Sequence, residues 1–137
     1  MTPATSPASA SRLLDIRDLH VEFDTPDGRV HAVRGVNCHI EKGECLGIVG
    51  ESGSGKSQTF LAAMGLLSSN GRARGTVDFN GRNMIGMPLR ELNRIRGHYV
   101  SMIFQDPLTS LTPHMRIGEQ MREVLRTHQR IAGREAD

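Results

Sequence analysis

The chain has 137 residues, of which 37% are hydrophobic and 23% charged, and its formal net charge at pH 7 is +2. This length supports one domain with a single buried core, and the composition is that of an ordinary globular protein. The small net charge gives no reason to expect a nucleic-acid partner. No stretch approaches the ~18 apolar residues that a membrane-spanning helix needs, so we expect any membrane role to depend on a partner.

The amino terminus and the cysteines exclude further classes. Residues 1–12 are rich in Ser, Ala, Pro and Thr and lack the apolar core of a signal peptide, so they predict a disordered tail before a domain over residues 13–137. Cys38 and Cys45 form no CxxC pair, which favours small buried strand residues in a reducing compartment over a disulfide or a metal site. The six histidines are scattered without ligand spacing, so no zinc site is predicted.

The first elements in the chain predict an antiparallel hairpin. Residues 13–23 alternate apolar and polar side chains, as a strand does, and residues 30–40 predict a second strand. The intervening residues 25–28 (Thr-Pro-Asp-Gly) are typical of a tight turn. Residues 45–49 are short and apolar throughout, which predicts a strand buried on both faces.

A helix is predicted next, over residues 57–67. It places Phe60, Leu61, Met64 and Leu67 on one face, as expected for a helix that packs on a core.

The remaining elements follow from turn residues and apolar runs. They are a loop over residues 68–75, a strand over 76–79 closed by an Asn80-Gly81 turn, a helix from Pro88 to 95, a buried strand over 99–104, a loop over 106–114 and a helix from 116 to about 131.

The last helix has two open interpretations. It carries Ile117, Met121, Val124, Leu125 and His128 on one face. This face either packs within the chain's own helical part or binds a partner helix, for which methionine side chains are well suited.

A phosphate-binding loop lies between the predicted buried strand and the first helix. Its sequence is Gly50-Glu51-Ser52-Gly53-Ser54-Gly55-Lys56-Ser57, which matches the pattern GxxxxGK[ST] in the structural context that the motif requires. Glycines allow backbone N–H groups to surround phosphates at a helix amino terminus. Lys56 supplies a point charge for the β- and γ-phosphates, and the Ser57 hydroxyl is a suitable Mg²⁺ ligand. The loop therefore predicts binding of a nucleoside triphosphate with Mg²⁺.

With its flanking residues, this loop makes the chain resemble the ATP-binding subunit of an ABC transporter of the oligopeptide/dipeptide importer branch. The resemblance runs from about residue 13 to residue 130, and the stretches that carry it are 21–28, 47–59, 80–82, 101–113 and 116–120. The stretch 101–113, Ser-Met-Ile-Phe-Gln-Asp-Pro-Leu-Thr-Ser-Leu-Thr-Pro, is the most specific. The implied fold is α/β of the P-loop NTPase class. It is an ABC ATPase core with a mixed sheet and an antiparallel β subdomain, which ends before the helical subdomain is complete.

The resemblance also implies a site for ATP and Mg²⁺. The implied nucleotide-binding residues are Phe23, Gly50, Glu51, Ser52, Gly53, Ser54, Gly55, Lys56, Ser57 and Gln58. Phe23 would stack on adenine, and plain hydrophobic packing is the alternative for this residue. Ser57 and Gln105 would bind the Mg²⁺, and Gln105 would relay the nucleotide state to the membrane subunits.

The implied partners are transmembrane permease subunits, contacted by the segment after Gln105, and a second ATP-binding subunit. The implied location is the cytoplasmic face of the inner membrane, as a peripheral protein. After Gln105 the sequence has no LSGGQ-like loop and no buried strand ending in Asp-Glu, so the catalytic set is incomplete. We therefore expect the chain alone to bind nucleotide weakly and to hydrolyse it negligibly. Two alternatives remain: an importer subunit for nickel or another small solute, and a non-transport ABC ATPase.

Overall fold

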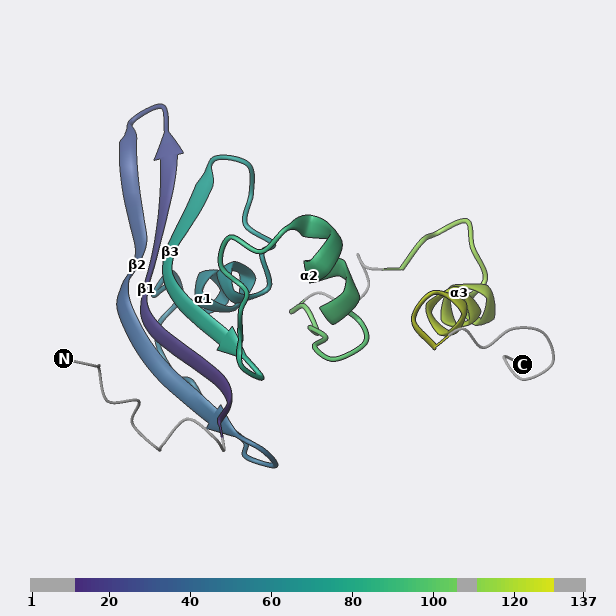
Figure 1. Ribbon diagram of the computed structural model, residues 1–137. Helices are drawn as coiled ribbons and strands as arrows, with labels where there is room; N and C mark the ends of the chain where they lie inside the picture. The colour runs from purple at the N-terminus through teal and green to yellow at the C-terminus, as the bar shows by residue number, and fades with distance from the viewer. Residues whose placement is uncertain (1–11, 106–110, 130–137) are drawn as a thin grey trace. The chain divides into compact units, whose positions relative to one another are not determined.

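The computed structural model describes residues 12–105 and 111–129, in two compact units that divide after Pro88. The first unit contains strands β1 (Arg12–Thr25), β2 (Gly28–Glu41), β3 (Gly71–Phe79) and β4 (Arg82–Asn83) and helix α1 (Lys56–Ala63); the second contains α2 (Leu89–Ile95) and α3 (Ile117–Gln129) (Figure 1). No helix in the described ranges has the length and hydropathy to cross a membrane.

The first unit is built on a four-stranded sheet in the order β2-β1-β3-β4, with every neighbouring pair antiparallel. The predicted hairpin is confirmed: β1 pairs with β2 along nearly its whole length. Its turn is closed by the Thr25 hydroxyl, which donates to the Gly28 carbonyl oxygen at 2.6 Å. Pairing with both β2 and β3 makes β1 the central strand for most of its length.

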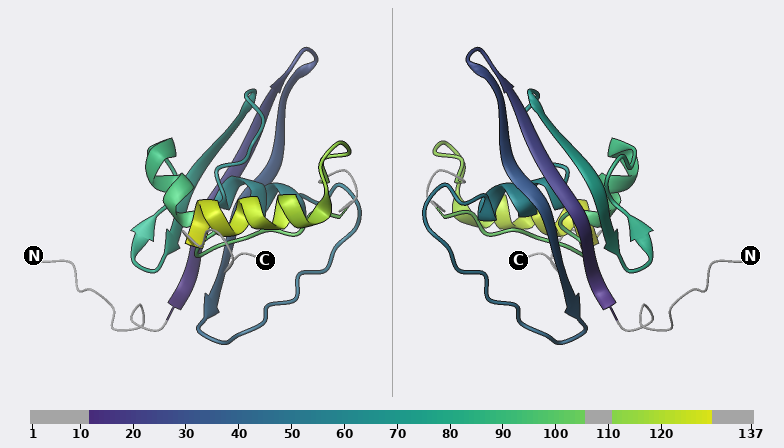
Figure 2. Two further views of the ribbon diagram at one scale, coloured as in Figure 1. Left: turned by 90° about the vertical axis from the view of Figure 1, so that its right-hand side faces the viewer. Right: turned by 90° about the vertical axis from the view of Figure 1, so that its left-hand side faces the viewer.

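Helix α1 covers one face of this sheet, as Figures 1 and 2 both show. Four side chains beneath it are fully buried: Ile16, Leu19 and Val21 on β1 and Val77 on β3. Because apolar burial stabilises a fold by ~25 cal/mol per Å², this layer is the main stabilising element of the first unit.

The predicted apolar face of α1 is only partly right. Met64 is buried, but Phe60 and Leu61 are half-buried, and the residues of the helix itself that are buried are Thr59, Ala62 and Ala63. Small side chains let the helix lie close to the sheet, which is why they take the contact face.

Helix α1 also ends earlier than predicted, at Ala63. The Leu66 N–H binds the Leu61 carbonyl at 2.7 Å, the Gly65 N–H binds the Ala62 carbonyl at 2.9 Å, and Gly65 has φ +64. This pair of hydrogen bonds around a left-handed glycine is the Schellman motif that terminates helices. Gly65 was the signal for this end in the sequence.

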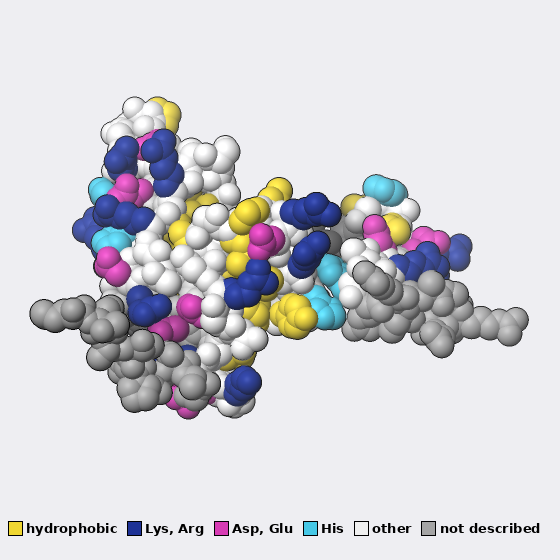
Figure 3. All heavy atoms as spheres, in the orientation of Figure 1, with side chains coloured by type: hydrophobic (Ala, Val, Ile, Leu, Met, Phe, Trp, Pro, Cys, Tyr) yellow, Lys and Arg dark blue, Asp and Glu magenta, His cyan; other side chains and the backbone are white. Residues whose placement is uncertain are grey.

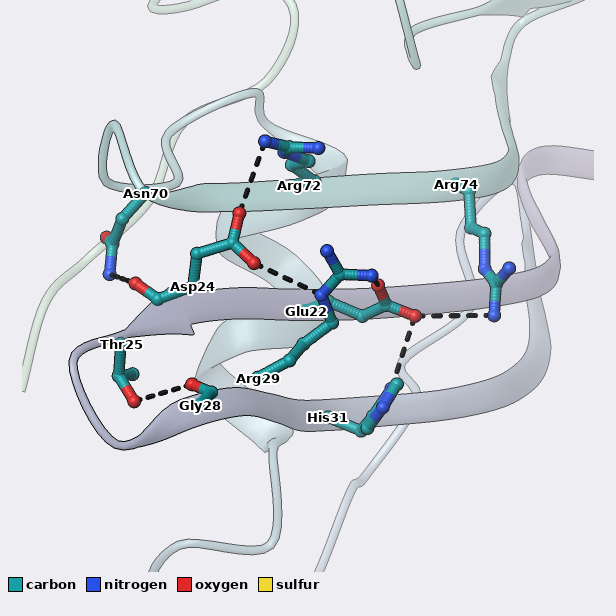
Figure 4. A network of polar contacts seen from close by, with 9 residues as sticks. All are labelled: Glu22, Asp24, Thr25, Gly28, Arg29, His31, Asn70, Arg72 and Arg74. Carbon is teal, nitrogen blue, oxygen red and sulfur yellow. Dashed lines mark hydrogen bonds and ion pairs between the residues drawn. The ribbon is translucent and has the colours of Figure 1, made fainter.

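The sheet face away from α1 carries a network of charges at the hairpin end, where acidic and basic side chains interleave (Figure 3). Glu22 lies within ion-pair distance of Arg29 (3.6 Å), His31 (3.2 Å) and Arg74 (3.4 Å), with only 17% of its side chain exposed. Asp24 pairs with Arg29 at 3.1 Å and with Arg72 at 3.2 Å. The two acids of β1 thus join it to both neighbouring strands (Figure 4).

Two predicted strands do not form. Residues 45–49 and 99–104 have no strand pairing beyond one isolated parallel bridge between Arg96 and Val100, and Val49 and Ile103 are 98% and 94% exposed. A strand buried on both faces requires hydrogen-bonded neighbours and covering helices. The part of the chain that the structure describes provides neither for these two segments.

The other predicted elements differ mainly in their ends. Strand β3 begins at Gly71, so part of the predicted loop over 68–75 is strand, while α2 agrees with the prediction and the described part of α3 does too. Residues 106–110 of the predicted loop, and the predicted tail except Arg12, which begins β1, lie outside the described residues.

The apolar face of α3 divides in two. Ile117, Met121 and Val124 are more than half exposed. His128, in contrast, is half-buried, and its ring lies against Gly97 within the second unit. Internal packing thus accounts for His128, whereas the partner interpretation stays open for the three exposed side chains.

Both cysteines are free thiols, but only one is the strand residue that was predicted. Cys38 lies half-buried in β2, whereas Cys45 is exposed and outside any strand. Burial, and then the nearby Asp15 carboxylate, raise the pKa of the Cys38 thiol, because both disfavour a thiolate.

Glu22→Gln should lower the free energy of unfolding by about 1–3 kcal/mol, because it removes the negative charge that Arg29 and Arg74 share. Urea denaturation measures this loss, which should shrink at high salt. Asp27→Asn is the matched control, since it makes the same charge change at an exposed position on the same hairpin. An equal effect of the two substitutions would show that the network is not stabilising.

Cys38 should react with iodoacetamide at pH 8 several-fold more slowly than Cys45, since its thiol is partly buried and its pKa is raised. The variants Cys45→Ala and Cys38→Ala each isolate one thiol, and mass spectrometry follows the reaction. Because folding raises the pKa of the Cys38 thiol above its ordinary value of about 9, the unfolded chain loses the proton first. The free energy of unfolding should therefore decrease as the pH rises through that value. Equal rates in the two folded variants would contradict the buried position of Cys38.

Candidate functional site

The predicted phosphate loop leads directly into α1. Gly53 and Gly55 have φ +82 and +89, a left-handed backbone that other residues rarely adopt, so the loop uses the freedom that its glycines provide. The N-cap residue of α1 is Gly55, and no side chain of the described residues caps this end of the helix. The first N–H groups of a helix lack partners inside it and carry a partial positive charge. This end of α1 therefore has the properties of an anion-binding site.

Lys56 folds back onto the loop. Its Nζ donates to the carbonyl oxygens of Gly50 at 2.6 Å and Glu51 at 2.7 Å, and lies 3.4 Å from the Ser54 hydroxyl. The ammonium group thus joins residues from both halves of the loop. Because an anionic phosphate oxygen is a stronger acceptor than a neutral carbonyl, a bound phosphate would compete for this donor.

The start of α1 is seated against β2 at Gly55. A Cβ on Gly55 would overlap the Ala32 carbonyl oxygen and lie 3.4 Å from Val33 Cγ2. Buried Thr59 holds the Gly55 carbonyl from the other side, through its N–H at 2.9 Å and its hydroxyl at 3.1 Å. The hairpin thereby determines where the loop ends and the helix begins.

Phe23 lies on β1, opposite Val30 of β2 and Gly71 of β3. Its ring lies against Gly71, next to Leu67, and it is half-buried. The packing interpretation of Phe23 therefore has direct support, and the remaining exposure is compatible with a second contact.

The other predicted site residues are distributed between the two units. Ser57 is exposed in the first turn of α1, and Gln58 beside it is half-buried. Gln105 is exposed at a bend in the second unit. The structure thus brings Gly50, Glu51, Ser54 and Lys56 together, while a pairing of Ser57 with Gln105 around one Mg²⁺ stays a prediction.

Gln120 organises the segment after Gln105, a role that sequence reasoning missed. Its amide accepts from the Thr112 N–H at 3.0 Å and donates to the carbonyls of Thr112 at 3.1 Å and Met115 at 2.9 Å. This pairing joins the preceding turn to the first turns of α3. A glutamine on a helix carries no local signal for such a contact.

Gly55→Ala should destabilise the first unit more than Gly53→Ala. Each substitution places a side chain at a left-handed position, which costs roughly 1–3 kcal/mol of strain. Only at Gly55 would the added Cβ also meet the Ala32 carbonyl. A Cβ built on Gly53 has no neighbouring atom within 4 Å. Urea denaturation of the two variants isolates the contact with β2. Equal losses would mean that α1 is not seated on the hairpin through Gly55.

Comparison with known proteins supplies an independent view of the chain. The ABC transporter family model matches residues 33–136. A solved structure of a dimeric bacterial ABC transporter cassette superposes with a TM-score of 0.75 at 24% identity, covering 88% of this chain and 50% of that one. The predicted class, a P-loop NTPase with the ABC ATPase fold, is thereby confirmed. The mixed sheet that the prediction included is not seen in the described residues, whose one sheet is antiparallel throughout, because the strand predicted at residues 45–49 does not form.

Curated relatives agree with the resemblance found in the sequence. The chain is 55% identical over 135 residues to the oligopeptide transport ATP-binding protein OppD of Salmonella typhimurium, covering 98% of this chain and 40% of the relative. It is 56% identical over 127 residues to OppD of Escherichia coli (93% and 38%) and 49% identical over 118 residues to the dipeptide transport ATP-binding protein DppD of Lactococcus lactis (85% and 34%).

The chain thus spans between 34% and 40% of the length of these relatives. Its family is nevertheless established, since the family model covers most of the chain and includes the whole phosphate loop. The chain belongs to the ABC transporter family.

Proposed function

We propose that residues 50–57 bind the triphosphate of ATP with Mg²⁺, and that residues 13–137 form the amino-terminal part of the ATP-binding domain of an ABC importer for oligopeptides or dipeptides. The observation that carries this proposal is the uncapped amino terminus of α1, which follows a loop with Lys56 at its centre.

A triphosphate fits this arrangement because the groups that would meet it are donors. The α1 terminus offers backbone N–H groups without a side-chain cap, and Lys56 offers an ammonium group that is now held by neutral carbonyl oxygens. On binding, the ammonium exchanges these carbonyls for phosphate oxygens, which form shorter and stronger charge-assisted hydrogen bonds.

The magnesium ion and the adenine base would use three further residues. Ser57 offers an exposed hydroxyl one residue into α1, and Gln105 offers an amide oxygen, both of them the hard oxygen ligands that Mg²⁺ prefers. Phe23, half-buried on β1, provides an aromatic surface for the base. Glu51, Ser52 and Gln58 complete the nucleotide-binding set.

The partner surface would lie after Gln105. Helix α3 exposes Ile117, Met121 and Val124, a set of apolar side chains suited to a helix of a transmembrane permease subunit. A second ATP-binding subunit would supply the groups needed for hydrolysis. The protein would then work as a peripheral component on the cytoplasmic face of the membrane.

Peptide cargo is proposed from the relatives alone. The similar proteins of Salmonella typhimurium and Escherichia coli are named for oligopeptide transport, and that of Lactococcus lactis for dipeptide transport.

Lys56→Ala should weaken binding of MgATP and of magnesium tripolyphosphate by about tenfold or more, because one charge-assisted contact contributes ~1.5–3 kcal/mol. Isothermal titration calorimetry on the 137-residue chain measures both affinities. The matched control is Lys42→Ala, which removes the only other lysine, an exposed residue outside the loop.

The proposal fails if Lys56→Ala and Lys42→Ala bind both ligands equally well. Phosphate release by the wild-type chain should equal that of the Lys56→Ala variant, since the catalytic set is incomplete in this sequence; faster release would contradict that expectation.

A further inference from the structure

We propose that Gly71 is a positioning residue that sets the orientation of the Phe23 ring toward the adenine base. This inference rests on the proposed function of Phe23. A Cβ built on Gly71 would lie 2.6 Å from Cε1 and 3.1 Å from Cδ1 of Phe23. Real Cβ atoms do not approach a ring so closely, so the Phe23 ring occupies the space that any other side chain at residue 71 would fill.

The register of the sheet explains this contact. Phe23 lies directly opposite Gly71, and Val21, two residues earlier on β1, lies opposite Ala73. Because alternate residues share a face of a strand, Phe23 lies on the face of completely buried Val21, which is the face that α1 covers. Leu67 beyond α1 approaches the same spot, at 3.2 Å from the Cβ position of Gly71.

The ring and the phosphate loop are supported by one short stretch of β2. Phe23 pairs with Val30, and Ala32, two residues further along, carries the carbonyl that faces Gly55. Two residues of an antiparallel strand span about 7 Å. The β1–β2 register shifts at this point, between Val21 and Glu22, which leaves Ala32 without a partner on β1. The same short stretch of β2 thus pairs with Phe23 and faces Gly55.

The backbone at Phe23 is also held from the opposite face. Glu22 and Asp24, on either side of it in sequence, bind basic residues of both β2 and β3 (Figure 4). The Asp24 N–H donates to the Asn70 carbonyl at 3.0 Å, and the Asn70 amide donates to the Asp24 carbonyl at 3.0 Å. The charge network thus sets the position of the strand, and Gly71 sets the orientation of the ring. A ring that is already oriented loses less conformational freedom when a base binds.

Gly71→Ala tests this directly, because Gly71 has no left-handed φ and the added methyl acts only on the space that the ring occupies. The affinity for ATP should fall about tenfold, a loss of 1.4 kcal/mol within the ~1–3 kcal/mol range of base stacking on an aromatic side chain. The affinity for magnesium tripolyphosphate, which has no base, should stay unchanged. Gly118→Ala is the matched control, since the atom nearest to a Cβ built on Gly118 is 4.0 Å away and Gly118 has no left-handed φ.

A double-mutant cycle with Phe23→Ala separates positioning from general damage. If Gly71 acts through the ring, Gly71→Ala has no further effect on ATP affinity once Phe23 is Ala. An equal loss in both backgrounds overturns the inference, and so does a parallel loss of tripolyphosphate affinity, which would indicate a change in the fold.

The outcomes also distinguish this inference from the proposed function beneath it. If Phe23→Ala weakens ATP binding but Gly71→Ala does not, the positioning role alone is overturned. If Phe23→Ala has no effect on ATP while Lys56→Ala still weakens both ligands, the base-stacking role is wrong and the triphosphate site stands. If Lys56→Ala leaves the affinities for ATP and for magnesium tripolyphosphate unchanged, the nucleotide site itself is overturned.

Discussion

The contact between Gly55 and the Ala32 carbonyl is the constraint on which the candidate site depends. A helix amino terminus attracts anions only if its N–H groups are held in place, and α1 is too short to be stable by itself. Its N-cap residue, Gly55, lies against β2, and Thr59 fixes the Gly55 carbonyl from within the helix. The antiparallel hairpin therefore positions the donors that would meet a phosphate in the proposed site.

The same hairpin supports the aromatic side of the site. Glu22 and Asp24 place their carboxylates among the arginines of both neighbouring strands, and the ion pairs lie on the face opposite Phe23. Surface ion pairs contribute little singly, but Glu22 is mostly buried by its partners and is shared among three of them. The network holds β1 at Phe23, so the charge pattern of one sheet face would support the proposed base-binding surface of the other.

The predictions from sequence agree with the structure where they depend on residues that are close together in the chain. The hairpin was predictable because alternation and the turn over residues 25–28 are local signals, and the phosphate loop because its glycines and Lys56 are contiguous. The strand predicted at residues 45–49 was wrong because an apolar run forms a strand only beside partner strands, and residues 12–105 and 111–129 supply none there. The predicted face of α1 was shifted because the closeness of the sheet, which favours Ala62 and Ala63, has no local signature.

By itself the sequence determined the family, the position of the glycine-rich loop before α1 and the first two strands, since each is encoded by neighbouring residues whose chemistry can be identified without knowing the fold. Only the tertiary structure decided that Lys56 is bound by the carbonyls of its own loop and that Gly71 gives space to the Phe23 ring. Lys56 depends on how the backbone of its loop is folded, which the residue pattern does not specify. For Gly71 the physical reason is the register of β1 against β3, which places Phe23 beside a residue 48 positions further along the chain. Such a contact depends on the packing of the whole sheet, and no pattern within either strand reports it.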